Sequence, residues 1–223
     1  MQFTNLYDLF VFDLDGTLAR TREDLAESVN HALERIGQPR RALEEVTRFI
    51  GNGARLLLER ALGPKASEPL LAEGLRIFLE HYEEHCLDRT KLYPGVLEVT
   101  AALAGAGKTL TVLTNKPTSM SLKILRGLGV ADRFVRIDGA DSFTRKKPDP
   151  MGLQEHMAAC AIPPGRTLMI GDSAVDAATA RAAGTACAGA LWGFKPEEFD
   201  AEPPDHFLRS MEDLLGPALS ERP

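Results

Sequence analysis

Polar side chains that could do acid–base and metal chemistry follow three apolar runs of the sequence. Asp13 and Asp15 come directly after Leu9–Phe12, within the segment Asp-Leu-Asp-Gly-Thr. Thr114 ends a second apolar run, and Asp172 ends a third. Carboxylates are hard oxygen ligands of the kind that Mg²⁺ prefers, and an aspartate can also attack phosphorus as a nucleophile. These residue types therefore predict a site for a divalent cation and a phosphate.

A basic segment and one further acid belong with this group. Arg145, Lys146 and Lys147 precede the third run, and Asp176 lies one helical turn beyond Asp172. A phosphate ester brings negative charge into an acidic pocket, so a metal ion and a lysine are needed to offset the repulsion. A carboxylic acid near the leaving oxygen can protonate it and later activate water. The combination predicts hydrolysis of a phosphate ester.

Each segment taken alone has a purely structural explanation. Asp-x-Asp-Gly-Thr is typical of a turn, Thr114 could end any strand, and Gly171-Asp172-Ser173 could begin any helix. Lys146 carries the same charge as Lys147, and spacing does not choose between them. An EF-hand is excluded, because the glycine and the acids stand at the wrong loop positions. It is the joint occurrence of the segments that favours a functional site.

Five short apolar runs, each followed by a stretch of helical length, set out the expected scaffold. They are Leu9–Phe12, Thr109–Leu113, 134–137, 167–170 and 186–191. Continuous apolar runs are typical of parallel strands that are covered on both faces. The alternation predicts a doubly wound, mainly parallel α/β sheet. Ligands bind at the carboxyl ends of such strands, where the polar residues stand.

Residues 21–91 break this alternation. Leu25, Val29, Leu33 and Ile36 recur every three or four residues, as on one buried helix face, and residues 56–62 and 70–82 repeat the pattern. About a dozen residues suffice for an ordinary crossover, so this insertion predicts a small helical subdomain. The expected division is an α/β core of residues 1–18 and 93–223 and an α-helical domain of residues 19–92.

Composition narrows the class of protein. Hydrophobic residues make up 44% and charged residues 26%, which indicates a folded chain, and the net charge of −6 argues against a nucleic-acid partner. No apolar run is long enough to cross a bilayer, and the N-terminus carries no signal-peptide pattern. Three scattered cysteines do not predict a disulfide framework. We expect a cytoplasmic protein without membrane or nucleic-acid partners; the oligomeric state stays open.

Together these segments resemble a known family. Asp13-Leu14-Asp15-Gly16-Thr17, Thr114, Lys147-Pro148 and Gly171-Asp172-Ser173-x-x-Asp176 are similar, in order, to the four motifs of the haloacid dehalogenase (HAD) superfamily. The resemblance spans nearly the whole chain, and the helical insertion resembles the α-helical cap of that superfamily. It implies a Rossmann-like core sheet with an inserted cap domain.

The resemblance also implies roles for the first motif. Asp13 would be the nucleophile that forms an aspartyl-phosphate, and it would also bind Mg²⁺. Asp15 would be the general acid and base, with its backbone carbonyl on the metal. Thr17 matches the last residue of the motif and would support this acid pair.

The later motifs carry the remaining implied roles. Thr114 would hydrogen-bond the phosphoryl oxygens, with Asn115 beside it in the substrate site. Lys147 would neutralise the phosphoryl oxygens and hold Asp13. Asp172 would bind Mg²⁺, and Asp176 would support Asp172 from behind.

Two features imply a reaction and a substrate. True dehalogenases lack a carboxylic acid at the position of Asp15, because a halide leaves without a proton, so its presence favours phosphoryl transfer. Residues 49–54 and 57–62 resemble the cap of phosphoglycolate phosphatases, as residues 113–116 resemble their core. The resemblance implies a Mg²⁺-dependent phosphatase of a small phosphorylated metabolite, with 2-phosphoglycolate as the expected substrate and glycolate and phosphate as products.

Several alternatives stay open at this point. The same core would serve a sugar-phosphate phosphatase, a pyrophosphatase or a phosphoglucomutase-like mutase. A non-catalytic HAD-like binding module is a further alternative, although such a module usually lacks the nucleophile. The substrate carboxylate would need a cation, for which Arg22, Arg48, Arg55 and Lys116 are candidates.

Overall fold

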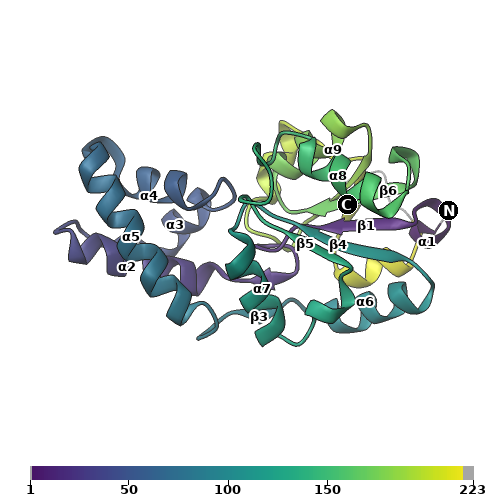
Figure 1. Ribbon diagram of the computed structural model, residues 1–223, viewed down its shortest axis with the longest axis horizontal. Coiled ribbons are helices and arrows are strands. Elements are labelled where there is room, and N and C mark those ends of the chain that lie inside the picture. The colour runs from purple at the N-terminus through teal and green to yellow at the C-terminus, as the bar shows by residue number, and fades with distance from the viewer. Residues whose placement is uncertain (1, 218–223) are drawn as a thin grey trace.

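A parallel six-stranded sheet forms the centre of the larger part of the protein (Figure 1). The computed structural model describes residues 2–217. The strand order is β5-β4-β1-β6-β7-β8, and every neighbouring pair is parallel. The strands are β1 (Leu9–Phe12), β4 (Thr109–Leu113), β5 (Arg136–Asp138), β6 (Thr167–Gly171), β7 (Ala186–Ala190) and β8 (His206–Leu208). The predicted doubly wound α/β sheet is thereby confirmed.

Helices cover both faces of the sheet. Successive side chains of β1 point to opposite faces, and since all of them are apolar, both faces need to be covered. Phe10 and Phe12 pack in one apolar cluster with α6 (Val96–Gly105) and α7 (Thr118–Gly127), while Leu9 and Val11 pack in a second cluster. The second cluster contains residues of α8 (Met151–Cys160) and α9 (Ala174–Ala183). All four side chains of β1 are fully buried, which places this strand in the middle of the core.

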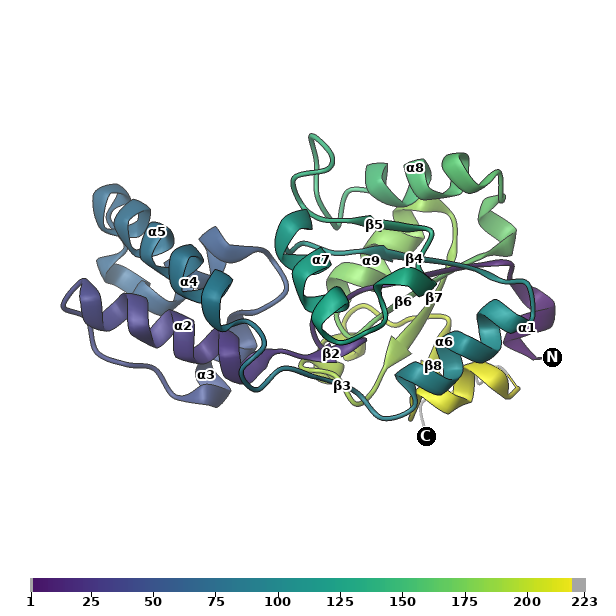
Figure 2. The ribbon, with the colours of Figure 1, turned by 60° about the horizontal axis from the view of Figure 1, so that its bottom comes forward.

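The inserted helices lie together beyond one end of the sheet (Figure 2). They are α2 (Arg22–Arg35), α3 (Leu43–Phe49), α4 (Ala54–Leu62) and α5 (Glu68–His85). Leu25, Val29 and Leu33 are buried on one face of α2, as their spacing predicts, and Ile36 is partly buried against the same cluster. The division into a core of residues 1–18 and 93–223 and a cap of residues 19–92 stays a prediction.

The two chain segments that lead into and out of the helices are tied to each other. Strands β2 (Ala19–Arg20) and β3 (Lys91–Leu92) pair antiparallel. The buried carboxylate of Asp24 accepts hydrogen bonds from the backbone N–H groups of Arg89 and Thr90 and from the Thr90 hydroxyl, at 2.8–3.0 Å. These contacts hold the start of α2 beside the end of the insertion.

Short elements account for the differences from the expected scaffold. The strand expected at 134–137 is β5, which begins at Arg136, and β2, β3 and β8 are not apparent from the sequence. Between residues 196 and 217 the chain contains two 3₁₀ turns, Pro196–Asp200 and Met211–Leu215, besides β8. Strands of two or three residues are too short to show a hydrophobic pattern in the sequence. They are defined only by the strands with which they pair. Within residues 2–217 no helix is long and apolar enough to cross a membrane.

Candidate active site

Three strands deliver the site because their carboxyl ends lie side by side. In the register of the sheet, Phe12 of β1 stands opposite Val112 of β4 and Ile170 of β6. Asp13 continues the pairing, with its N–H donating to the carbonyl of Ile170 at 2.8 Å. Asp13, Thr114 and Asp172 all follow these strand ends at once, and all three are buried. The expected meeting of the polar clusters at one sheet edge is therefore observed.

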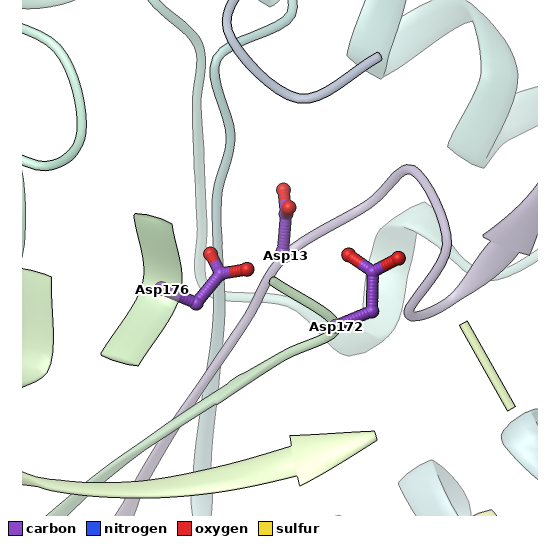
Figure 3. A group of neighbouring side chains, drawn as sticks. All are labelled: Asp13, Asp172 and Asp176. Carbon is purple, nitrogen blue, oxygen red and sulfur yellow. The ribbon is translucent and has the colours of Figure 1, made fainter. Parts of the chain in front are cut away.

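Three carboxylates gather at this edge (Figure 3). Asp13, Asp172 and Asp176 are buried, and one carboxylate oxygen of each lies within 4.8 Å of the others. Asp176 belongs to the first turn of α9, where its Oδ2 accepts hydrogen bonds from the N–H and the hydroxyl of Ser173. This capping box fixes the orientation of Asp176 at the start of the helix.

Lys147 is the cation of this cluster. Its Nζ lies 3.1 Å from Asp13 Oδ1 and 2.6 Å from Asp176 Oδ1, and the residue is only 3% exposed. Burial lowers the pKa of the ammonium, but the two carboxylates outweigh burial and raise the pKa above its ordinary value. Lys146, its rival in the sequence, donates instead to the carbonyl of Asn52. The structure thus distinguishes two lysines that the sequence does not.

Burial and mutual repulsion destabilise the charged forms of Asp13 and Asp172. Burial, with Asp176 and Asp15 adding to it, raises the pKa of Asp13 to about 6, although Lys147 opposes the shift. Burial and the neighbouring carboxylates raise the pKa of Asp172 well above its usual range. Three buried carboxylates face the one ammonium of Lys147, so negative charge is in excess. An all-oxygen set of donors with excess negative charge fits Mg²⁺.

Gly16 allows the turn after Asp13 to lie close to Asp172. Gly16 has φ +83°, a left-handed conformation, and a Cβ at this position would overlap the carboxylate of Asp172. The Asp172 carboxylate also accepts a hydrogen bond from Phe194 N–H at 2.6 Å. The turn that carries Asp13 and Asp15 can therefore lie against Asp172 only without a side chain at position 16.

Asp15 has one hydrogen-bond partner before α2 and one charged partner after β4. Its Oδ1 accepts a hydrogen bond from the Thr21 hydroxyl at 2.6 Å, and its Oδ2 lies 3.0 Å from Lys116 Nζ. Thr17 is fully buried, and its carbonyl accepts a hydrogen bond from Trp192 Nε1. The Thr17 hydroxyl has no hydrogen-bond partner among the described residues, so it makes no hydrogen bond to Asp13 or Asp15.

The segment after β4 joins the sheet to the insertion. Thr114 is buried at the strand end, and its hydroxyl accepts a hydrogen bond from Lys116 N–H. The amide of Asn115 donates to the carbonyls of Gly51 and Lys147, both at 3.0 Å. Asn115 therefore connects the loop of the insertion to the loop that carries Lys147.

A cavity of about 40 Å³ lies between these strand ends and the inserted helices. Asp13, Asp15, Thr114 and Lys116 line its floor. Its other walls are mainly apolar and include Leu25, Ile50, Leu57, Phe78, Tyr82 and Met120. Tyr82 is a part of the site that the sequence does not reveal, because its spacing shows only that it belongs to a buried helix face.

Fold and site together define an α/β enzyme with a buried carboxylate–lysine centre at the carboxyl edge of its sheet. The family model described as "Haloacid dehalogenase-like hydrolase" matches residues 10–190. The chain belongs to the haloacid dehalogenase-like hydrolase family.

Relatives and solved structures agree with this membership. The chain is 38% identical to the phosphoglycolate phosphatase of Vibrio vulnificus strain YJ016, an alignment that covers 95% of this chain and 96% of the relative. It is 36% identical to that of Mesorhizobium japonicum, with 96% and 95% covered. A crystal structure described as a predicted phosphoglycolate phosphatase from Haemophilus somnus 129PT superposes with a TM-score of 0.89 at 32% identity, with 94% and 96% covered.

Proposed function

We propose that the protein is a Mg²⁺-dependent phosphatase that hydrolyses 2-phosphoglycolate to glycolate and phosphate. The observation that carries the proposal is the cluster of Asp13, Asp172 and Asp176 around Lys147, beneath a small cavity. Phosphoglycolate phosphatases that align over more than nine-tenths of the chain support the substrate. Phosphoric monoester hydrolysis is the activity that both the family and the site support.

The first half of the proposed reaction transfers the phosphoryl group to Asp13. A carboxylate oxygen of Asp13 attacks phosphorus, and the bond from phosphorus to the ester oxygen breaks. Asp15, beside the same cavity, donates a proton to the leaving oxygen. Glycolate therefore leaves with a neutral hydroxyl group instead of an alkoxide. The product on the enzyme is an aspartyl-phosphate.

The second half regenerates the enzyme. Asp15, now ionised, takes a proton from water while the water oxygen attacks phosphorus, and the bond from phosphorus to Asp13 breaks. Inorganic phosphate leaves, and both aspartates return to their starting states. Apolar walls such as Leu57 and Phe78 restrict how much water reaches the intermediate.

The remaining residues hold charge in place. Asp13, Asp172 and the Asp15 carbonyl would hold Mg²⁺, which supplies positive charge against the phosphoryl oxygens when it is bound. Lys147 adds a second positive charge and is itself held by Asp176. Thr114 lines the cavity, and we assign it a hydrogen bond to the phosphoryl group. Asn115 keeps the surrounding loops together.

A cytoplasmic location and a small phosphorylated metabolite as the only partner complete the proposal. Cys86, Cys160 and Cys187 are free thiols, as expected for a protein of a reducing compartment. Fractionation of cells with an antibody to the protein tests the location. Recovery of the protein mainly with membranes would contradict it.

The decisive experiment is a substrate panel. Initial rates with Mg²⁺ are measured for 2-phosphoglycolate, sugar phosphates, nucleotides and pyrophosphate. We expect kcat/KM for 2-phosphoglycolate to exceed every other value by about tenfold or more. A flat profile would remove the specific substrate and leave a general phosphatase. Conversion of a hexose 1-phosphate to its 6-phosphate without release of phosphate would identify a mutase, and silence across the panel would contradict the enzyme assignment.

A further inference from the structure

We infer that Lys116 is the residue that binds the carboxylate of the substrate, through the ammonium that also pairs with Asp15. The inference rests on the proposed function, because it assumes a leaving group that carries a carboxylate. It identifies the residue that would distinguish 2-phosphoglycolate from phosphate esters with a neutral leaving group.

The cavity offers a single cation. Among the described residues that line it, Lys116 alone has a cationic side chain. Lys116 is 7% exposed, and its Nζ lies 3.0 Å from Asp15 Oδ2 and 3.2 Å from the hydroxyl of Tyr82. The ammonium also lies 4.6 Å from the centre of the Tyr82 ring. One residue of the core and one of α5 thus hold this charge against the cavity.

The three arginines that the sequence leaves as rivals lie elsewhere. Arg55 is exposed and pairs with Glu68 at 2.6 Å. Arg22 pairs with Glu23 and has a side chain that is 40% exposed. Arg48 is exposed on α3. None of the three lines the cavity, whereas Lys116 does.

The structure of the proposed substrate places its carboxylate beside Lys116. Only two covalent bonds separate the ester oxygen of 2-phosphoglycolate from its carboxylate carbon. Asp15, as the proton donor, must lie within hydrogen-bond reach of that ester oxygen. The carboxylate then has to lie close to Asp15 as well, and the neighbouring cation on that side is Lys116.

The charges at the cavity favour a carboxylate at this place. A substrate carboxylate within reach of the Lys116 ammonium would add a second ion pair to the one that Lys116 makes with Asp15, whereas a neutral leaving group adds none. The walls around Phe78 and Met120 are apolar and carry no further cation. The site would therefore discriminate by charge complementarity.

The test compares two substrates that differ only in the carboxylate. kcat/KM is measured for 2-phosphoglycolate and for ethyl phosphate, in the wild-type enzyme and in Lys116→Met. We expect the variant to lose about a hundredfold on 2-phosphoglycolate and less than about tenfold on ethyl phosphate, so that the ratio of the two values collapses. Lys116→Arg, which keeps the charge, is expected to retain a higher ratio than Lys116→Met.

Lys146→Met is the matched control. Lys146 is also a lysine between core and insertion, but its Nζ binds the Asn52 carbonyl and it does not line the cavity. We expect this variant to keep the wild-type ratio. An equal loss on both substrates in Lys116→Met, or an unchanged ratio, would overturn the inference. A wild-type enzyme that does not prefer 2-phosphoglycolate to ethyl phosphate would instead refute the proposed substrate.

Product inhibition tests the same inference without a variant, in case Lys116→Met does not fold. Glycolate and its neutral isostere glycolamide are compared as competitive inhibitors of the wild-type enzyme. We expect glycolate to bind at least about tenfold more tightly, since only glycolate carries the charge that Lys116 would bind. Equal inhibition constants would overturn the inference.

Discussion

The ammonium of Lys147 lies 3.1 Å from a carboxylate oxygen of Asp13, although the two residues are far apart in the sequence. Both side chains are buried, and a carboxylate oxygen of Asp176 lies 2.6 Å from the same ammonium. The pair joins the end of β1 to the loop before α8. We expect its charge balance to affect both the stability of the fold and the chemistry at the sheet edge.

Lys147→Met is expected to impair both properties. The variant leaves three buried carboxylates without their ammonium, which costs about 3 kcal/mol of unfolding free energy in metal-free buffer. kcat should fall by about a hundredfold or more, since one phosphate-neutralising charge is lost. Urea unfolding and initial rates measure the two effects, with Lys146→Met as the control. Wild-type stability and turnover in Lys147→Met would show that the ion pair has neither role.

Asp13→Asn is expected to abolish turnover while the fold is kept. Asparagine has nearly the same shape but is not a nucleophile of comparable strength, so kcat should fall by at least about a thousandfold. The melting temperature should stay close to that of the wild type, because the change removes one of several crowded negative charges. Acid-quenched enzyme should carry covalent phosphate in the wild type and none in the variant. Retained turnover would refute the nucleophile.

Mg²⁺ is expected to stabilise the protein as well as to activate it. A ligand that binds only the folded state at a hundred times its Kd adds about 2.7 kcal/mol of stability, so Mg²⁺ should raise the melting temperature of chelator-treated enzyme. Asp172→Asn should remove most of this rise. The thermal shift is read without substrate and is independent of turnover. Full activity after thorough chelation would exclude the proposed role of the metal.

Gly16→Ala tests the close approach of the first turn to Asp172. Gly16 and Gly37 both have positive φ, so alanine costs each about 1–2 kcal/mol of stability. Only at Gly16 would the new Cβ also meet a carboxylate, whereas nothing lies within 4 Å of it at Gly37. We expect Gly16→Ala to lose about a hundredfold in kcat and Gly37→Ala to keep nearly all of it. Equal activities would show that the approach is not needed.

Asp8 is expected to contribute stability that depends on pH. Hydrogen bonds from Arg166 and Lys108 lower the pKa of its carboxyl to about 2. Because the folded pKa lies below the unfolded value of about 4, the contribution is complete above pH 4 and is lost as the pH falls toward 2. Water screens this partly exposed group, so the contribution is no more than about 1 kcal/mol.

Asp8→Asn measures this contribution. In urea unfolding the variant should be less stable than the wild type at pH 6, and the difference should shrink at pH 3. Asp132→Asn, at an exposed acid of the chain, serves as the control. A difference that is constant between pH 6 and pH 3 would contradict the assignment of the effect to ionisation of Asp8.

Local features of the sequence determine the central strands of the sheet and the residues at their ends, but not the edge strand β8. Leu9–Phe12 and Thr109–Leu113 are strands over the expected residues, because a continuous apolar run between polar segments can only be buried on both faces. The acids after these runs then have to meet, since parallel strands present their carboxyl ends at one edge. The four motifs that begin at Asp13, Thr114, Lys147 and Gly171 are local in sequence, so they can be recognised without the structure.

Tertiary structure alone decided which of several equivalent charges belong to the site. Lys147 rather than Lys146 meets Asp13, and Lys116 rather than any of three arginines faces the cavity, although all of these residues look alike in the sequence. Tyr82 reaches the site only because α5 packs over the strand ends. A side chain's charge is a local property, but its distance from another charge depends on how remote segments pack, and the electrostatic energy varies with that distance.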